Sequence, residues 1–158
     1  MLEVGQSPAD FSLMDQTGAP VQWKDLRGQP VVIFFYPKAS TPGCTKEACA
    51  FTDLGGEFTA SGIHVFGASA DSVSRQKNFS EKYALSMSLL SDPEHTILKP
   101  WGVWGEKKNY GKTYMGIIRS TFLFDANGML LECWKNVRVK GHADRVLEQA
   151  QTLLAETK

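Results

Sequence analysis

The chain has 158 residues, the length of a single domain, here taken as residues 1–158. Hydrophobic residues make up 42% and charged residues 22%, which is a globular composition and excludes a disordered chain. Basic and acidic residues balance at 17 each, so neither nucleic acid nor an anionic membrane surface is an expected partner. The longest apolar run, 31–36, is far shorter than the ~20 residues of a membrane-spanning helix.

The first thirty residues are predicted to form turns and short extended segments. No basic or apolar leader is recognisable at the N-terminus, so the cytoplasm is the expected location. The run Val31 to Tyr36 follows, bracketed by Pro30 and Pro37. It is β-branched and aromatic with no polar alternation, which is typical of a strand that is covered on both faces.

The remaining elements are predicted in chain order from periodicity, caps and turn residues. They are a helix over 41–58 weakened by Gly55-Gly56, a strand over 63–68, a helix from Asp71 or Ser72 to Tyr83, a strand over 87–90, a helix over 94–99, strands over 115–124 and 129–135 joined by the turn 125–128, and a helix over 142–155. This order predicts an α/β sandwich with a central, mostly parallel sheet that has an antiparallel edge and is covered on both sides.

The segment 100–116 carries four aromatic residues, Trp101, Trp104, Tyr110 and Tyr114, among glycines and lysines. Three interpretations stay open: a wall of the functional site, a docking face, or a long packed loop. We favour packing over stacking on nucleic acid because the net charge is zero.

Three cysteines, Cys44, Cys49 and Cys133, are present, an odd number with no Cys-x-x-Cys spacing. Such a count is typical of a reducing compartment, where a disulfide would be transient and chemical. The three histidines match no metal-ligand spacing, so neither a metal nor an organic cofactor is expected.

Cys44 is placed where a buried strand gives way to a helix, the usual crevice for ligands in α/β sheets. With Thr41 at the N-cap and Pro42 at the first helical position, Cys44 is the third helical residue. Unpaired amides and the positive end of the helix dipole favour a thiolate there. The larger thiolate fraction lowers the activation barrier by only about two kcal/mol. A fast nucleophile therefore also needs hydrogen-bond donors aimed at the charge that develops as a bond breaks.

Arg119 is the candidate donor, because a cation within the apolar strand predicted over 115–124 is costly unless it is paired or functional. A snorkelling or edge-strand charge is the alternative. Glu47 lies three residues after Cys44 on the same helix face, and it makes sense if it pairs with an arginine such as Arg119. It would otherwise be an ordinary first-turn glutamate.

Cys49 lies five residues beyond Cys44, which in an α-helix separates the two Cα atoms by about 8.6 Å. Disulfides need Cα atoms within roughly 7 Å, so the two thiols cannot join while the helix stays intact. Either Cys49 is a buried apolar residue, or the helix opens during the chemistry. Cys133 alternates with Met129 and Leu131 and is interpreted as a core cysteine.

Across nearly its whole length the chain resembles the peroxiredoxins, specifically the peroxiredoxin Q or bacterioferritin comigratory protein subfamily. The motifs that carry the resemblance are Pro37-x-x-x-Thr41-x-x-Cys44, Cys44-x-x-x-x-Cys49, 89–92, 102–107, 110–112 and 119–122. Two positions depart from the usual pattern: Ala39-Ser40 stands where the subfamily often has Asp-Asn, and Trp101 stands where a tyrosine is usual. Neither substitution removes a reacting group, and both are expected to alter the rim of the pocket.

The resemblance implies a thioredoxin-like fold, a central mixed β-sheet with helices on both faces. It implies that Cys44 is the peroxidatic and Cys49 the resolving cysteine, that Pro37, Thr41 and Arg119 complete the peroxide site, and that Glu47 orients the arginine. The implied activity is reduction of hydrogen peroxide and alkyl hydroperoxides through a sulfenic acid and an intramolecular disulfide, in antioxidant defence. Thioredoxin or a similar dithiol would recycle the enzyme, which is expected to be a monomer.

Two other interpretations remain. A thiol–disulfide exchange protein would turn over Cys44 and Cys49 with dithiols but react slowly with peroxide. A binding or holdase module would tolerate Cys44→Ser, and Arg119 would then have no purpose. One question within the site also stays open, namely whether the Thr41 hydroxyl caps the helix or faces the peroxide.

Overall fold

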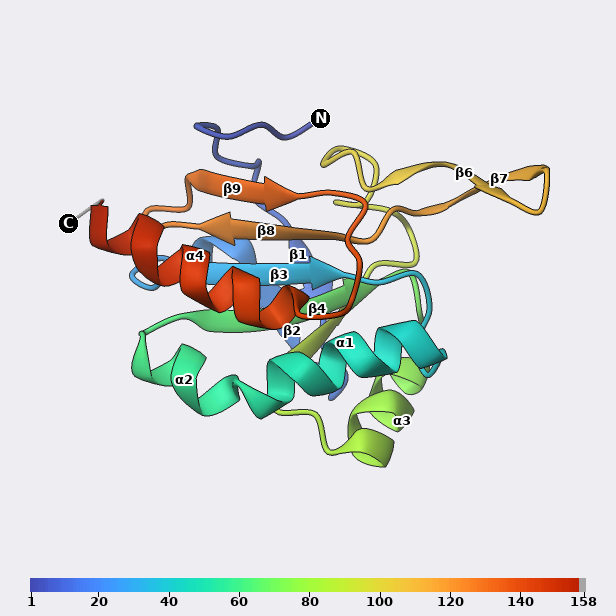
Figure 1. Cartoon of the computed structure of the whole chain (residues 1–158), viewed down its shortest axis with the longest axis horizontal. Helices are drawn as coiled ribbons and strands as arrows, with labels where there is room; N and C mark the ends of the chain where they lie inside the picture. The colour runs from blue at the N-terminus through green and yellow to red at the C-terminus, as the bar shows by residue number, and fades with distance from the viewer. Residues whose placement is uncertain (157–158) are drawn as a thin grey trace.

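A seven-stranded mixed sheet forms the centre of the computed structural model, which describes residues 1–156 (Figure 1). Its strands are β1 (Ser12–Met14), β2 (Pro20–Gln22), β3 (Val31–Phe35), β4 (His64–Ser69), β5 (Ser88–Ser91), β8 (Ser120–Phe124) and β9 (Leu130–Trp134). They lie in the order β2-β1-β5-β4-β3-β8-β9. Only β3, β4 and β5 are parallel neighbours, and the pairs on both flanks are antiparallel. The prediction of a mostly parallel sheet is therefore wrong, whereas the predicted mixed sheet of a thioredoxin-like sandwich is confirmed.

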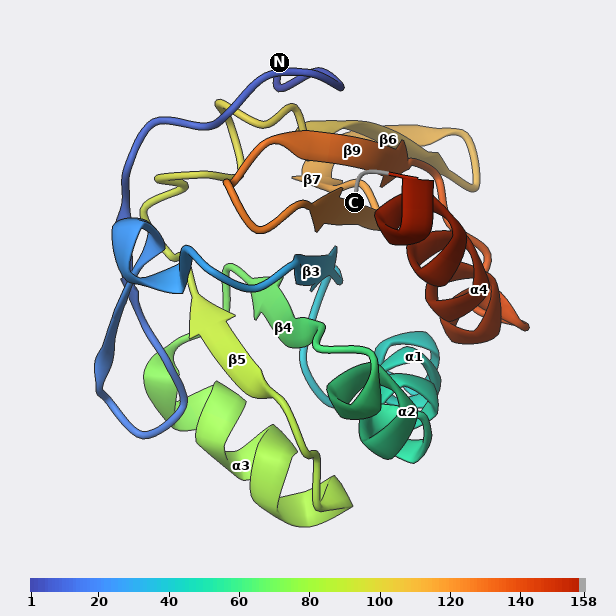
Figure 2. The same cartoon turned by 90° about the vertical axis from the view of Figure 1, so that its left-hand side faces the viewer.

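The four α-helices share one face of this sheet. They are α1 (Pro42–Asp53), α2 (Gly55–Ala60), α3 (Val73–Tyr83) and α4 (His142–Glu156). Phe51, Phe58, Phe79 and Val146, one from each helix, join a single apolar cluster, and Figure 2 shows the helices together on one side of the central strands. The other face is covered by the 3-10 helix η1 (Trp23–Leu26), the N-terminal segment and the turns of 92–103. Both faces are covered, but unequally.

Strand β3 is buried on both faces, as predicted. Val31, Ile33 and Phe35 point into one apolar cluster, and Val32 and Phe34 point into the other. None of the five is more than 1% exposed. Burying each such side chain stabilises the fold by about 1.5–3 kcal/mol, so β3 is a rigid base for the loop that leaves its carboxyl end.

Helix α1 is anchored to this base by aromatic stacking. The rings of Phe51 and Phe34 lie parallel with their centroids 4.5 Å apart. The helix predicted over 41–58 is broken at Leu54, where α1 ends and α2 begins with Gly55 and Gly56. The two adjacent glycines lower the helix propensity enough to allow this break. Helix α3 begins where predicted, with the Ser72 hydroxyl as its cap.

The prediction of a short helix over 94–99 is wrong, because these residues form turns. The buried carboxylate of Asp92 accepts the amides of Thr96, Ile97 and Leu98 at 2.7, 3.0 and 3.1 Å. His95 adopts a left-handed φ of 60°. A side-chain acceptor and a left-handed residue together replace the helical hydrogen bonds.

The strand predicted over 115–124 is two strands with different partners. β7 (Lys112–Ile117) pairs with β6 (Trp104–Asn109) in a separate hairpin, and β8 belongs to the central sheet. The hairpin projects from the body of the molecule (Figure 1). Tyr110 at its turn is 98% exposed, so a fully packed loop over 100–116 is also wrong. Trp101 does pack, at 3% exposure.

Candidate active site

Cys44 lies in the first turn of α1, directly beyond the loop that leaves β3. Thr41 occupies the N-cap and Pro42 the first helical position, as predicted. Cys44 is then the third helical residue and is 1% exposed. Cys44 therefore lies in the first turn of α1, the end of a helix where backbone amides lack helical acceptors.

Arg119 is brought to Cys44 by the register of two antiparallel strands. Ser120 pairs with Phe35, so Arg119 lies beside the carboxyl end of β3, where the loop to Cys44 begins. Its Nη2 donates to Cys44 Sγ at 3.4 Å. The backbone here is fixed by hydrogen bonds from Val137 N to Arg119 O and from Ile118 N to Val103 O. The prediction that Arg119 lies inside a strand is wrong, because the residue lies in the two-residue crossing between β7 and β8.

Glu47 holds the other end of the same guanidinium. Arg119 Nη1 lies 2.7 Å from Glu47 Oε1, and the Glu47 side chain is 1% exposed. Within residues 1–156, Glu47 Oε2 has no hydrogen-bond partner. Burial raises the pKa of Glu47 to about 7, although the charge and hydrogen bond of Arg119 act to lower it. Burial disfavours the charge of Arg119, but Glu47 and Cys44 outweigh it and raise the pKa of the guanidinium.

The Thr41 hydroxyl does not cap α1. It donates to Lys38 O at 2.8 Å. No donor among residues 1–156 contacts the hydroxyl oxygen, so its lone pairs can accept a hydrogen bond from a protonated ligand oxygen. The loop turns at Ser40, which has a left-handed φ of 66°.

Pro37 and Lys107 both line two neighbouring hollows of the surface. One hollow, of about 540 Å³, is also lined by Arg119 and Val137. The other, of about 570 Å³, lies between the hairpin and the start of α3 and is walled by Trp104. The hairpin thus forms a wall beside the site, one of the interpretations left open for 100–116. Lys107 Nζ donates to Ile117 O at 2.8 Å.

Cys49 lies further along the same unbroken helix. In the described chain all three cysteines are free thiols, and α1 is continuous over Pro42–Asp53. Burial, with a contribution from Asp53, raises the pKa of Cys49. Cys133 packs against the core, and burial raises its pKa to about 11. Its thiolate is therefore scarce at neutral pH, which fits a core cysteine.

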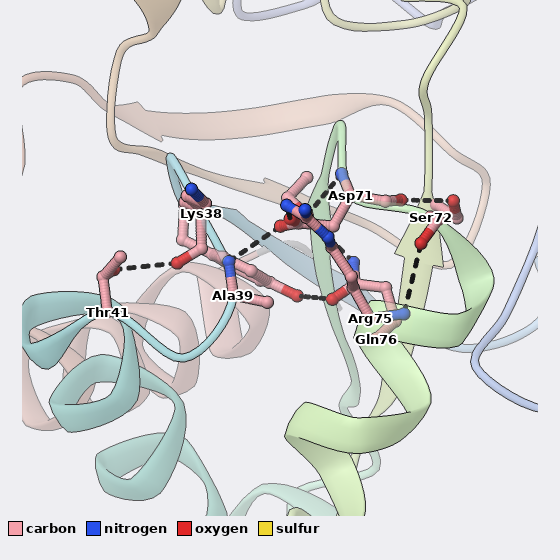
Figure 3. A network of polar contacts seen from close by, with 10 residues as sticks. Lys38, Ala39, Thr41, Asp71, Ser72, Arg75 and Gln76 are labelled. Atoms are coloured by element: carbon pink, nitrogen blue, oxygen red, sulfur yellow. Dashed lines mark hydrogen bonds and ion pairs between the residues drawn. The ribbon is translucent and has the colours of Figure 1, made fainter.

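Sequence reasoning missed a buried polar network on the neighbouring strand end (Figure 3). Asp71, treated there only as a possible helix cap, accepts the Ala39 amide at Oδ2, 2.7 Å away. Ser69 and Gln76 complete the network. A signal was available, because Asp71 follows β4, the parallel neighbour of β3, and the carboxyl ends of parallel strands meet at one edge.

Together these features define a cysteine-dependent enzyme on an α/β scaffold, with an arginine and a carboxylate assembled around one sulfur. The AhpC/TSA family model matches residues 4–132. Peroxiredoxin Bcp of Bacillus subtilis is 44% identical over 152 residues, 96% of this chain and 95% of that protein. Peroxiredoxin Bcp of Escherichia coli is 43% identical over 146 residues, 92% of this chain and 94% of that protein.

Solved structures give the same result. A structure of the Xanthomonas campestris bacterioferritin comigratory protein, described in connection with its alkyl peroxide reduction activity, has a TM-score of 0.88 at 39% identity, covering 100% of this chain and 99% of that one. A cysteine mutant of Xylella fastidiosa peroxiredoxin Q has a TM-score of 0.92 at 31% identity, with coverage of 100% and 99%. The chain belongs to the AhpC/TSA family, in its Bcp/peroxiredoxin Q branch, and is a thiol peroxidase.

Proposed function

We propose that Cys44 is the peroxidatic cysteine and that it reduces hydrogen peroxide and alkyl hydroperoxides. The observation that carries this proposal is the 3.4 Å contact between Arg119 Nη2 and Cys44 Sγ, with Arg119 Nη1 held by buried Glu47. Glu47 orients the guanidinium, and the guanidinium supplies positive charge where an anionic sulfur and a departing oxygen both need it. The relatives named above support the same chemistry.

In the first step the Cys44 thiolate attacks one oxygen of the hydroperoxide. A sulfur–oxygen bond forms and the oxygen–oxygen bond breaks, so the sulfur is oxidised to a sulfenic acid. The other oxygen leaves as hydroxide or alkoxide and takes up a proton to become water or an alcohol. Arg119 stabilises the charge on that departing oxygen.

Thr41 and Pro37 place the peroxide. Because the Thr41 hydroxyl already donates to Lys38 O, its oxygen serves as an acceptor for the protonated peroxide oxygen. Pro37 lines the hollow that contains Arg119 and restricts the backbone at the loop entrance. Together they hold the two reacting atoms in line, a positioning effect that can account for several kcal/mol of the barrier.

In the second step Cys49 attacks the sulfenic sulfur of Cys44 and water is released, leaving a disulfide within one chain. In the intact helix the two Cα atoms are separated by about 8.6 Å, so the first turns of α1 unwind before the bond forms. An external dithiol, of which thioredoxin is the expected example, then restores both thiols by exchange. The single domain acts as a monomer because the resolving thiol comes from the same chain.

The cytoplasm, where dithiol reductants are maintained, is the expected site of action. Among the described helices none has the length and apolarity to cross a membrane.

Stopped-flow tryptophan fluorescence tests the proposal. Reduced protein is mixed with hydrogen peroxide, and the peptide that contains Cys44 and Cys49 is then analysed by mass spectrometry. A fast signal that is linear in peroxide and ends in a Cys44–Cys49 disulfide is expected. A rate typical of a free thiol, unchanged by Arg119→Ala, would exclude a specialised peroxide site and favour a thiol–disulfide exchange protein.

A further inference from the structure

One buried carboxylate ties the loop between β3 and α1, residues 36–41, to the end of the neighbouring strand β4. Asp71 is 8% exposed, and its Oδ2 accepts both the Ala39 amide and the Ser69 hydroxyl at 2.7 Å. Its other oxygen, Oδ1, lies 3.9 Å from Arg75 Nη1 at the protein surface. A backbone amide bound to an ionised acceptor forms one of the stronger hydrogen bonds in a protein.

Asp71 is itself held firmly. The Asp71 amide donates to Ser69 Oγ at 3.1 Å, and the Ser91 hydroxyl donates to Asp71 O. Gln76 donates to Ser69 Oγ at 3.0 Å and to the carbonyl of Leu90 at 2.9 Å. The anchor therefore rests on β4, β5 and α3 together, away from the helix that must move.

The same network also holds the start of the loop. The Tyr36 hydroxyl donates to Gln76 Oε1, and the Tyr36 amide bonds to Ala68 O at 3.1 Å. Figure 3 shows the contact from Ala39 to Asp71 beside Gln76 and Arg75. The chain from Tyr36 to Ala39 is thus fixed at both ends by groups outside the loop.

Beyond Ala39 the support becomes local. In the described chain Thr41 donates only to Lys38 O, from its hydroxyl at 2.8 Å and from its amide at 3.4 Å, which is longer than a good hydrogen bond. Within residues 1–156, the next long-range polar contact is that of Cys44 with Arg119. Ser40, between the two regions, is held at a left-handed φ of 66°. Such a conformation persists only where the surrounding structure over-determines it.

We propose that Asp71 is a positioning residue of the peroxidase, which anchors Ala39 and thereby makes Ala39–Ser40 the boundary at which α1 unwinding stops. With Ala39 fixed, Ser40 stays left-handed and α1 begins at Pro42 with Thr41 as its N-cap, which places Cys44 against Arg119. Without the anchor, Ser40 relaxes, the start of α1 shifts, and the wound form of the helix is disfavoured. This inference rests on the proposed roles of Cys44 and Cys49.

Asp71→Ala is expected to change the two chemical steps in opposite directions. The peroxide-dependent phase slows about tenfold, because the reacting groups lose their alignment. The later, peroxide-independent phase, in which the disulfide forms, accelerates several-fold because unwinding is easier. At excess peroxide, the fraction of Cys44 oxidised further to sulfinic acid falls for the same reason. Asp71→Asn keeps one oxygen acceptor and is expected to retain most of the wild-type behaviour.

Ser72→Ala is the matched control. It removes the hydroxyl that caps α3, next to Asp71, and so lowers the stability of the fold as the loss of a helix cap does. The contact of Asp71 with the Ala39 amide stays intact. Stopped-flow fluorescence and mass spectrometry are run on all three variants. The inference is overturned if Asp71→Ala changes both phases less than twofold, or if Ser72→Ala reproduces its effects.

Amide hydrogen exchange on the reduced wild-type protein tests the anchor without a variant or any activity. The Ala39 amide is expected to be protected at least tenfold more than the amides of Ser40 and Thr41. Equal exchange at these positions would overturn the anchor even if Asp71→Ala fails to fold. If instead wild-type protein shows protection but no fast reaction with peroxide, the proposed function fails while the anchor stands.

Discussion

Arg119 and Glu47 form a buried ion pair, 2.7 Å from Nη1 to Oε1, that leaves the second guanidinium nitrogen aimed at Cys44. The two residues are separated by 72 positions in the sequence and meet only because β8 returns beside β3. The pair fixes the direction of the donor before a peroxide arrives. A donor held in place in this way has little reorganisation cost during the reaction.

Replacing Arg119 by alanine is expected to slow the peroxide-dependent phase by about 10²–10³-fold, the usual cost of losing one donor to a developing oxyanion. Stopped-flow fluorescence with hydrogen peroxide measures the rate. Arg138→Ala, which removes an exposed arginine further along the chain, is the control for loss of positive charge. Equal rates for the two variants would contradict the role of Arg119.

Glu47 predicts a specific pH dependence of stability. Its folded pKa is about 7 against 4.5 for a free side chain, so between these values the folded protein holds a proton that the unfolded chain releases. The contribution of Glu47 to stability is therefore full below about pH 4.5 and declines by up to about 3 kcal/mol as the pH rises to 7.

Urea unfolding of wild type and Glu47→Gln at pH 5 and pH 8 isolates this contribution. The unfolding free energy of the wild type, relative to the variant, is expected to fall between the two pH values. A difference that is constant or that increases with pH would show that Glu47 ionises normally in the folded protein.

Cys49 and Cys133 provide a matched pair of substitutions. Cys49→Ser is expected to consume a first equivalent of peroxide at the wild-type rate, and then to lose turnover with a dithiol because no disulfide forms. Cys133→Ser is expected to retain turnover, since Cys133 packs against the core. Peroxide consumption in the presence of a dithiol, with mass spectrometry of the products, distinguishes them. Retained intramolecular turnover in Cys49→Ser would assign the resolving role elsewhere.

The absence of a side chain at Gly43 leaves room for the Arg119 guanidinium. A Cβ at this position would lie 3.3 Å from Arg119 Nη2, close enough to displace the guanidinium. Gly43→Ala should therefore reduce the peroxide rate several-fold, although alanine favours a helix by about 0.8–1.0 kcal/mol.

Gly56→Ala is the control, because a Cβ there would meet nothing within 4 Å. Thermal unfolding and stopped-flow rates are measured for both variants. We expect Gly56→Ala to keep the wild-type rate. A wild-type rate in Gly43→Ala would show that the Arg119 guanidinium can shift without slowing the reaction with peroxide.

Local patterns predicted the elements that depend on neighbouring residues. The buried run ending in Phe35, the Pro42 helix start and the cap at Ser72 all follow from side-chain type and spacing, and the structure contains each of them. The strand predicted through Arg119 failed for a physical reason. Apolar residues continue on both sides of the crossing, so the sequence pattern does not reveal that β7 and β8 pair with different strands.

The sequence by itself determined where Cys44 lies relative to the strand and the helix start, because these are short-range properties of the backbone and its side chains. Only the tertiary structure decided what surrounds the sulfur. The contacts of Cys44 with Arg119 and of Ala39 with Asp71 depend on which strands are neighbours and in which register. Strand order is set by the packing of the whole chain, and no local periodicity encodes it.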